Sequence, residues 1–290
     1  MSVKTIAPEE LAPDARASAP TAGRAPAAPA NKRGQTVNVV TRRILLIVPP
    51  LLLGAFILIS WYLGTTYGHV PSLILPAPGD VFATLSDGIV SGLFLSNALV
   101  TIQESLVGFM LALGIALPLG YGIAKSRLFA ATVQPYLAAG QAIPAIVIFP
   151  LLTLWFGYGL IPIFILCMLV VLFPMVITTA LGFQTIDQSL VDAARVEGAS
   201  GWSMLAHIEF PLALPAILAA IRTGLTLSIV GAIVGEFVNQ VDQGLGFLVL
   251  SARDQFDTAL LFATLIVMAS LATLYYGASW LLVKLAEAIY

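Results

Sequence analysis

Long apolar runs, separated by short polar segments, make up most of the chain after residue 43. A helix that crosses a bilayer needs about 20 consecutive residues that are mostly apolar. Measured against that length, the pattern predicts an all-α polytopic membrane protein with six spanning helices, over residues 44–63, 98–124, 134–156, 160–183, 213–238 and 258–283. Several of these runs contain a proline, at which membrane helices tolerate a kink: Pro118, Pro144, Pro150 and Pro174.

Composition agrees with that pattern, because 59% of the residues are hydrophobic and only 10% are charged, unlike a soluble globular domain. Residues 1–41 differ from the rest: they repeat Ala and Pro with scattered charges, which predicts a disordered N-terminal tail. The first apolar run begins only at Ile44, is long enough to span and lacks a small-residue cleavage pattern, so we expect no cleaved signal peptide. Residues 42–290 are therefore predicted to form the transmembrane domain.

Lys and Arg fall almost entirely on one side of the predicted topology. With the N-terminus inside, the tail through Arg43, the turn at Lys125 and the loop at Arg195 are cytoplasmic, and only Arg253 of the 13 basic residues lies outside. The connection over 64–96 has neither Lys nor Arg. Because cytoplasmic loops of membrane proteins are enriched in these residues, both termini are predicted to be cytoplasmic.

Small residues recur at every fourth position in two of the predicted spans. Small side chains let helix backbones approach closely in lipid, although Ala and Gly are also simply common in membrane helices. Two series of five favour close packing, so we assign them to the bundle interior or to a dimer interface: Gly108, Ala112, Ala116, Gly120 and Ala124, and Ala216, Ala220, Gly224, Ser228 and Ala232.

Two connections on the predicted outer side carry a structural signal. The first contains Val81, Phe82, Leu85 and Ile89 at a spacing that places them on one face of a short helix at the membrane surface. The second, over 239–257, is either a docking surface for a soluble partner or a solvated loop.

The most polar segment between spans covers residues 185–212 and has the signals of two short helices. Asp187 can cap a first helix that runs through Glu197, and Gly198 suits a left-handed turn after it. Ser200 can cap a second helix, and Pro211 follows the end that we expect for it. This predicts a helix-turn-helix on the cytoplasmic face.

The side chains of this segment suit a contact with another protein. Ala193 and Ala194 leave a surface without bulky groups, while the second helix offers apolar anchors, as in a helix-in-groove contact: Trp202, Met204, Leu205 and Ile208.

The spacing of this segment resembles the "EAA" loop of the permeases of binding-protein-dependent ABC importers. That loop reads Glu-Ala-Ala, three residues, Gly, nine residues, Ile, one residue, Leu-Pro. Here Asp192-Ala193-Ala194, Gly198, Ile208 and Phe210-Pro211 keep every interval. Asp192 stands for Glu and Phe210 for Leu, so charge and apolarity are conserved at both departures.

Most of the chain after residue 70 is similar to the nitrate/sulfonate/taurine branch of that family. The similarity rests on Leu75-Pro76-Ala77-Pro78, Pro144, Pro150-Leu151, Trp155-Phe156-Gly157-Tyr158-Gly159, Glu236 and Gly244-Leu245-Gly246. The resemblance implies a type I, methionine-importer-like permease fold in the inner membrane of a prokaryote. Its implied partners are a second permease copy (expected to make a homodimer), two ATPase subunits and an extracytoplasmic substrate-binding protein.

The family works by alternating access, in which ATP closes the ATPases and the EAA helices carry that movement into the spans. The resemblance assigns this coupling to Asp192, Ala193, Ala194, Glu197, Gly198, Trp202, Ile208 and Pro211. The chain has no Gly-x-x-x-x-Gly-Lys-Ser/Thr loop to hold phosphates, so ATP and Mg are expected on the partner ATPases and no cofactor on this chain.

A membrane-embedded enzyme is the competing class. Asp192-Ala193-Ala194-Arg195 with Gly198 is faintly similar to the acidic signature of phospholipid-alcohol phosphotransferases, but that signature needs further aspartates that hold metal, and here Trp202, Met204 and His207 follow. His69 and His207 are predicted on opposite sides of the membrane, and His-Glu-x-x-His is absent from the sequence. We therefore expect neither a catalytic nor a metal site.

The substrate has two readings. Arg222, inside the fifth span, could attract an anion of the nitrate, sulfonate or taurine kind, or instead be a gate or an anchor near the cytoplasmic end. Gln141 before Ile143-Pro144 is more similar to permeases for riboflavin or thiamine-pyrimidine precursors, and we favour that heteroaromatic class. The candidate pathway residues are Gln141, Trp155, Phe156, Tyr158, Arg222 and Glu236, with packing as the alternative role for the three aromatics.

Overall fold

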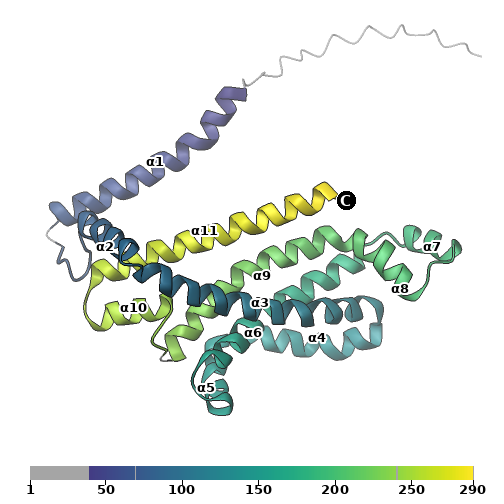
Figure 1. Ribbon diagram of the computed structural model, residues 1–290. Coiled ribbons are helices and arrows are strands. Elements are labelled where there is room, and N and C mark those ends of the chain that lie inside the picture. Colours follow the sequence, from purple (N-terminus) through teal and green to yellow (C-terminus); the bar gives the residue numbers. More distant parts are fainter. Residues whose placement is uncertain (1–38, 69, 240, 290) are drawn as a thin grey trace, which may run out of the picture. The chain divides into compact units, whose positions relative to one another are not determined.

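The computed structural model describes residues 39–68, 70–239 and 241–289, and every regular element in these ranges is a helix (Figure 1). The prediction for the tail, residues 1–41, falls outside the described residues except for the last three, which already begin the first helix. The helices are α1 (Val39–Thr66), α2 (Pro78–Val90), α3 (Leu93–Lys125), α4 (Arg127–Ala142), α5 (Ala145–Phe156), α6 (Leu160–Gln184), α7 (Gln188–Val196), α8 (Gly201–Met204), the π-helical turn η1 (Leu205–Glu209), α9 (Phe210–Asn239), α10 (Leu245–Asp254) and α11 (Thr258–Ile289).

The chain divides into two units, Met1–Leu53 and Gly54–Tyr290. Of the first unit the structure describes residues 39–53, which are helical through Pro49 and Pro50. The second unit contains the helical bundle, and the following description concerns that unit.

The described residues contain five candidate membrane spans, or six if a bent pair of helices counts as one. Five helical stretches are long and apolar enough to cross a bilayer, and α4 with α5 forms a sixth whose two halves meet at 98°. The span predicted over 134–156, with Pro144 inside it, is divided into two helices rather than only kinked. Pro144 has no N–H group and restricts Ile143 to an extended conformation, here φ −84° and ψ 119°, so the helix stops and restarts. Pro118, Pro150 and Pro174 lie inside helices that continue past them.

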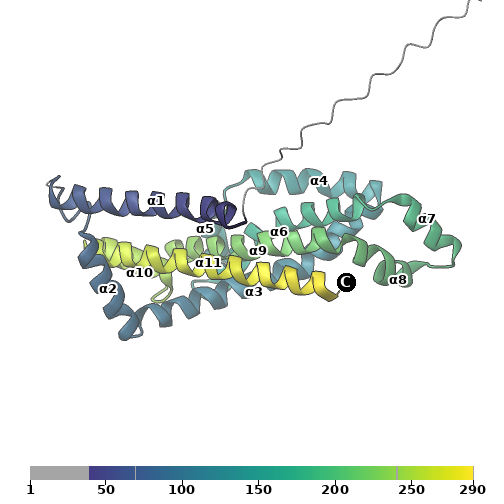
Figure 2. The same cartoon turned by 90° about the horizontal axis from the view of Figure 1, so that it is seen from above.

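The core of the bundle is the packing of α3, α6 and α9, which lie side by side in both ribbon views (Figures 1 and 2). Both series of small residues point into it: Ala112, Ala116 and Ala232 are fully buried, and Ala220 is nearly so. A methyl group added at Gly120 would come within 2.7 Å of Thr179 on α6. The bundle interior predicted for these series is confirmed, because side chains larger than hydrogen or methyl would hold the backbones apart.

The two outer connections are more buried than the sequence indicated. In α2, Val81 is completely buried in a cluster with Phe94 and Leu245, while Phe82 and Ile89 are exposed, so the helix packs on the bundle through Val81. The apolar face expected at the membrane surface is thus partly turned toward protein. The connection over 239–257 is not a plain solvated loop, because α10 lies in it and buries Leu245.

The two ends of the bundle differ in their polar contacts. At the end marked by α7 and α8, α3 meets η1 through Lys125 and Glu209. At the other end, marked by α10, the start of α6 meets the end of α9 through Gly159 and Asn239. Successive crossings therefore run in alternating directions, as short connections between spans require.

Candidate functional site

Residues 185–212, called here the α7–η1 element, form a helical hairpin at one end of the bundle. Its α7 starts as predicted, because the exposed Asp187 carboxylate accepts a hydrogen bond of 2.9 Å from the Ser189 backbone N–H. That bond holds the pKa of the Asp187 carboxyl below its usual value of 3.8, since it favours the charged form. Gly198 ends the helix with φ +94°, the left-handed conformation expected of it, and the Ala199 N–H returns to the Ala194 carbonyl at 2.9 Å.

The second half of the hairpin departs from the sequence prediction. Ser200 stands at the N-cap, but its backbone carbonyl, rather than its side chain, accepts the bond from Ser203 at 3.1 Å. The expected end of the helix before Pro211 is wrong, because residues Gly201–Asn239 run on as one helical stretch into the membrane. The wide turn η1 ends at Glu209, two residues before Pro211, whose ring has no N–H to donate to the helical hydrogen bonds. The element is therefore joined rigidly to α9.

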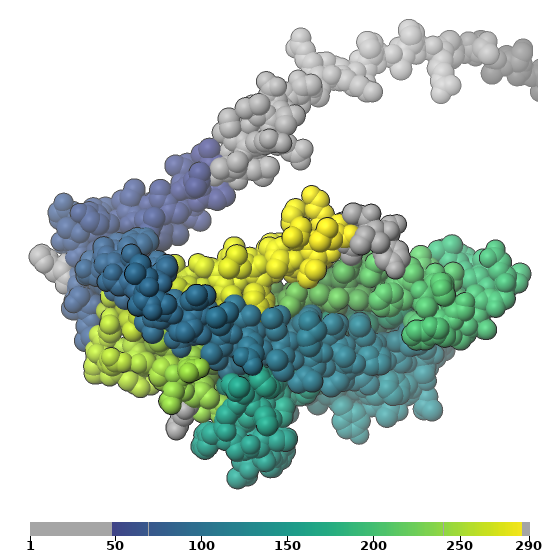
Figure 3. Space-filling model, in the orientation of Figure 1, coloured from purple at the N-terminus to yellow at the C-terminus, as the bar shows by residue number. Residues whose placement is uncertain are grey.

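Only some of the predicted anchors remain free for a partner. Met204 and Ala194 are buried against Val191 inside the hairpin, so they stabilise the element itself. Trp202, in contrast, is 77% exposed. In the space-filling view the green atoms of α7 and α8 project past the end of the neighbouring helices, where another protein could reach them (Figure 3).

A groove of about 340 Å³ brings together five of the eight residues predicted for coupling. The groove lies between α7 and the start of α9, and the predicted residues that line it are Ala193, Ala194, Glu197, Ile208 and Pro211. The other three lie elsewhere. Asp192 pairs with Arg195 at 3.0 Å on the surface, Gly198 lines a separate hollow beside Tyr121 and Lys125, and Trp202 is exposed.

Sequence reasoning missed the residue that attaches this element to α3. Glu209 is 1% exposed, forms an ion pair with Lys125 and accepts a hydrogen bond of 3.0 Å from the Tyr121 hydroxyl. The available signal was an acid inside an otherwise apolar Ile-Glu-Phe-Pro stretch, together with a basic end of the second span on the same predicted side. A buried carboxylate needs such a partner.

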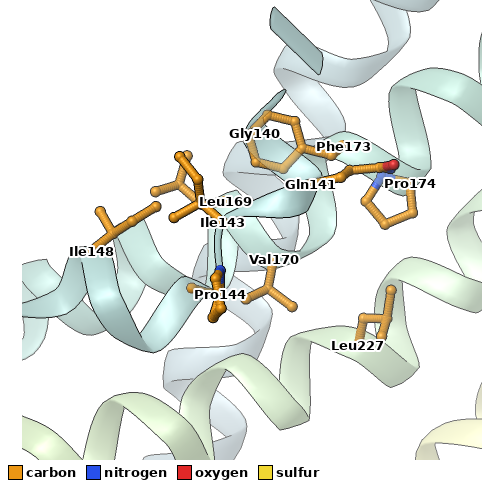
Figure 4. Close-up of a pocket in the computed structure, with 11 residues that line it drawn as sticks. Gly140, Gln141, Ile143, Pro144, Ile148, Leu169, Val170, Phe173, Pro174 and Leu227 are labelled. Carbon is orange, nitrogen blue, oxygen red and sulfur yellow. The ribbon is translucent and has the colours of Figure 1, made fainter. Parts of the chain in front are cut away.

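The candidate pathway residues do not gather at one place. Gln141 lines a cavity of about 420 Å³ at the α4–α5 bend, and of the described residues that line it Gln141 alone has a long polar side chain (Figure 4). Trp155, Phe156 and Tyr158 are half or more exposed at the far end of α5, and none of them lines that cavity. The 98° bend separates the amide from the aromatics.

Arg222 and Glu236 also lie away from that cavity. The Arg222 guanidinium carbon lies 4.2 Å from the ring centroid of Tyr276, a cation–π contact that joins α9 to α11. Glu236 is 1% exposed, and its two oxygens accept hydrogen bonds of 2.5 Å from Thr101 and from the Gly246 N–H. Glu236 therefore does not line that cavity, and its hydrogen-bond donors come from the chain itself.

Known proteins similar to this chain are membrane transport permeases. Residues 114–285 match the family described as binding-protein-dependent transport system inner membrane component. The riboflavin transport system permease protein RibX of Chloroflexus aurantiacus is 40% identical over 230 residues, covering 79% of this chain and 85% of that protein. The putative aliphatic sulfonates transport permease protein SsuC of Bacillus subtilis is 30% identical over 219 residues, covering 76% of this chain and 79% of that protein.

The fold is shared with a solved transporter. A chain of the MetNI methionine ABC transporter, in an inward-facing conformation, is 19% identical with a TM-score of 0.58, covering 64% of this chain and 92% of that chain. This agrees with the type I fold implied by the sequence. The chain therefore belongs to the family of binding-protein-dependent transport system inner membrane components, the permeases of ABC importers.

Proposed function

We propose that this multi-pass inner-membrane permease pairs with a second copy to form the pathway of an ATP-driven importer. Its solute is a small heteroaromatic compound of the riboflavin or thiamine-pyrimidine kind, delivered by an extracytoplasmic binding protein. The permease itself performs no hydrolysis; ATP and Mg are held by two partner ATPases, and this chain binds no cofactor.

The α7–η1 element supports the coupling part of the proposal. Its groove of about 340 Å³ offers the small Ala193 between Glu197 and Ile208, a concave apolar surface with an acidic rim. The element runs without a break into α9, and Glu209 attaches it to α3. A push on the hairpin from an ATPase therefore reaches two spans directly.

Charge supports the orientation of the molecule. Lys125, Arg127 and Arg195 lie at the α7–α8 end, whereas Arg253 at the α10 end is paired with Asp254 at 2.7 Å. Because cytoplasmic ends are rich in Lys and Arg, the α7–α8 end faces the cytoplasm, where ATP is found.

One observation carries the substrate class: the cavity at the α4–α5 bend has an amide and apolar walls, and none of the described residues that line it is charged. An anion would need a positive group there, whereas Arg222 lies against Tyr276. A neutral ring system matches such walls, since apolar surface binds the ring and the Gln141 amide can both donate and accept hydrogen bonds. The 40% identity to a protein named for riboflavin transport agrees with this choice.

Uptake into proteoliposomes tests the proposal, with the permease reconstituted together with its own ATPase and binding protein. Labelled riboflavin or the thiamine pyrimidine should accumulate with ATP, and Gln141→Leu should slow this uptake about tenfold, the loss expected for a hydrogen bond of about 1.4 kcal/mol. Accumulation of an aliphatic sulfonate, with neither ring compound transported, would overturn the substrate class and favour the anion alternative.

The aromatic residues near Gly157 need a separate comparison. Trp155→Leu tests whether Trp155 contacts the solute, and Leu154→Ala, a change at the neighbouring exposed position of α5, is its control. A slower uptake for the first variant alone would place Trp155 on the path.

A further inference from the structure

A polar network joins α3, α9 and the start of α10 inside the otherwise apolar α10 end of the bundle. Three successive backbone N–H groups there donate to side chains of α3 and α9: Gly244 to Asn97 at 2.8 Å, Leu245 to Thr101 at 3.0 Å and Gly246 to Glu236 at 2.5 Å. These are the groups that a helix start leaves without partners, so the network replaces water that cannot reach them.

Glu236 accepts two hydrogen bonds within this network. One of its oxygens accepts from the Thr101 hydroxyl and the other from the Gly246 N–H, both at 2.5 Å. The start of α10, a helix of 10 residues, adds a favourable dipole. A methyl group at Gly246 would come within 2.8 Å of the Glu236 carboxylate, so glycine is what lets the backbone approach it.

Glu104 lies beside Glu236 and has no such support. It is on α3, one turn after Thr101, and is completely buried, and neither of its carboxyl oxygens has a hydrogen-bond partner among the described residues. Thr101, one turn earlier on α3, donates to Glu236 at 2.5 Å, which places the two acids together, and Glu236 is the acid that acts on Glu104. No ion pair of the described residues includes either acid.

The other titratable groups nearby cannot neutralise a second negative charge. From α6 the buried Cys167 faces both acids, and from α11 Tyr275 approaches Ser105, with 2.7 Å between the two hydroxyl oxygens. From α10 the contacts are backbone N–H groups that Asn97, Thr101 and Glu236 already use. Two adjacent buried carboxylates without a cation repel each other and are both desolvated, at a cost of several kcal/mol.

We infer that Glu104 is held as the neutral carboxylic acid with its proton directed at Glu236, so that the two side chains form a binding site for one proton. A carboxylic acid is a donor, whereas a carboxylate only accepts. The proton thus gives the orphaned Glu104 oxygen a partner and adds a third donor to the Glu236 carboxylate. The site binds α3 to α9 and α10 at the outer end, and it is separate from the cavity at the α4–α5 bend.

The two acids should respond differently to replacement by Gln. The permease is purified with its ATPases in detergent, and its thermal unfolding is followed by fluorescence. Glu104→Gln should leave the midpoint unchanged or raise it, because the amide N–H₂ donates to Glu236 as the acid would. Glu236→Gln should lower it by several degrees, because an N–H₂ group cannot accept from Thr101 or from the Gly246 N–H.

Infrared spectra of the same samples at neutral pH test the proton itself. The C=O stretch of a protonated carboxylic acid should be present in the wild type and in Glu236→Gln, absent in Glu104→Gln, and unchanged in Asp87→Asn, an exposed acid of α2 that serves as the control. The same carboxylic-acid band in wild type and in Glu104→Gln would overturn the proton site. An unfolding midpoint that rises with Na⁺ or K⁺ in the wild type, and no longer does so in Glu104→Gln, would also overturn it and indicate a metal cation instead.

Discussion

The ion pair between Lys125 and Glu209 gives the sharpest test of how the α7–η1 element is attached. We expect Lys125→Met to weaken that attachment, because methionine keeps most of the apolar stem and removes the charge. Losing one partner of a fully buried pair costs about 3–5 kcal/mol, and an exposed pair is worth roughly 0.2–1 kcal/mol. The Glu209 side chain is 2% exposed and that of Lys125 is 37% exposed. Solvent screening therefore places the loss between these limits, at about 2 kcal/mol.

The measurement is thermal unfolding of the detergent-solubilised permease, combined with a double-mutant cycle. Arg127→Met is the matched control, since Arg127 is an exposed basic residue two positions away with no ion pair among the described contacts. In a Glu209→Gln background the loss from Lys125→Met should fall to a few tenths of a kcal/mol, because no buried charge is then left unpaired. Equal losses in both backgrounds, or equal midpoints for Lys125→Met and Arg127→Met, would refute the reasoning.

Three further changes test other parts of the fold. Gly198→Ala should lower the free energy of unfolding by about 1–2 kcal/mol through its φ of +94° alone, because nothing lies within 4 Å of the added methyl. Substrate-stimulated ATP hydrolysis should fall as well, and unchanged hydrolysis would contradict the coupling role of Gly198. Gly108→Ala should lower the free energy of unfolding by about 1–3 kcal/mol, because the added methyl overlaps Cys167. Gly114→Ala on the same helix, with open space around it, should be neutral in the same unfolding assay. Equal unfolding midpoints for the two variants would contradict the close approach of α3 and α6. The pKa of Asp187 is lowered in the folded state, so its cap stabilises α7 above the ordinary pKa of 3.8, and this stabilisation is lost as the pH falls through the folded value. Hydrogen exchange of the Ser189 amide should accelerate in that pH range. An Asp187→Asn variant should not show that pH dependence.

Local signals predicted the elements well and their relations poorly. Asp187 and Gly198 marked the limits of α7 because capping and positive φ depend on a few neighbouring residues. The end expected before Pro211 was wrong, because proline is compatible with a helix when a wide turn precedes it. For the candidate path, Gln141 and Trp155 are 14 residues apart in sequence, and only the bend at Pro144 shows that they do not share a cavity.

By itself the sequence determined the all-helical membrane class, the family through the spacing from Asp192 to Pro211, and the interior face of the small-residue series. These follow from hydropathy, helical periodicity and fixed intervals, all of which are local. Only the tertiary structure decided that Glu209 is paired with Lys125, and that Glu104 lies unpartnered beside Glu236. The latter two acids are 132 residues apart in the chain, and their ionisation depends on burial and neighbours that no local pattern specifies.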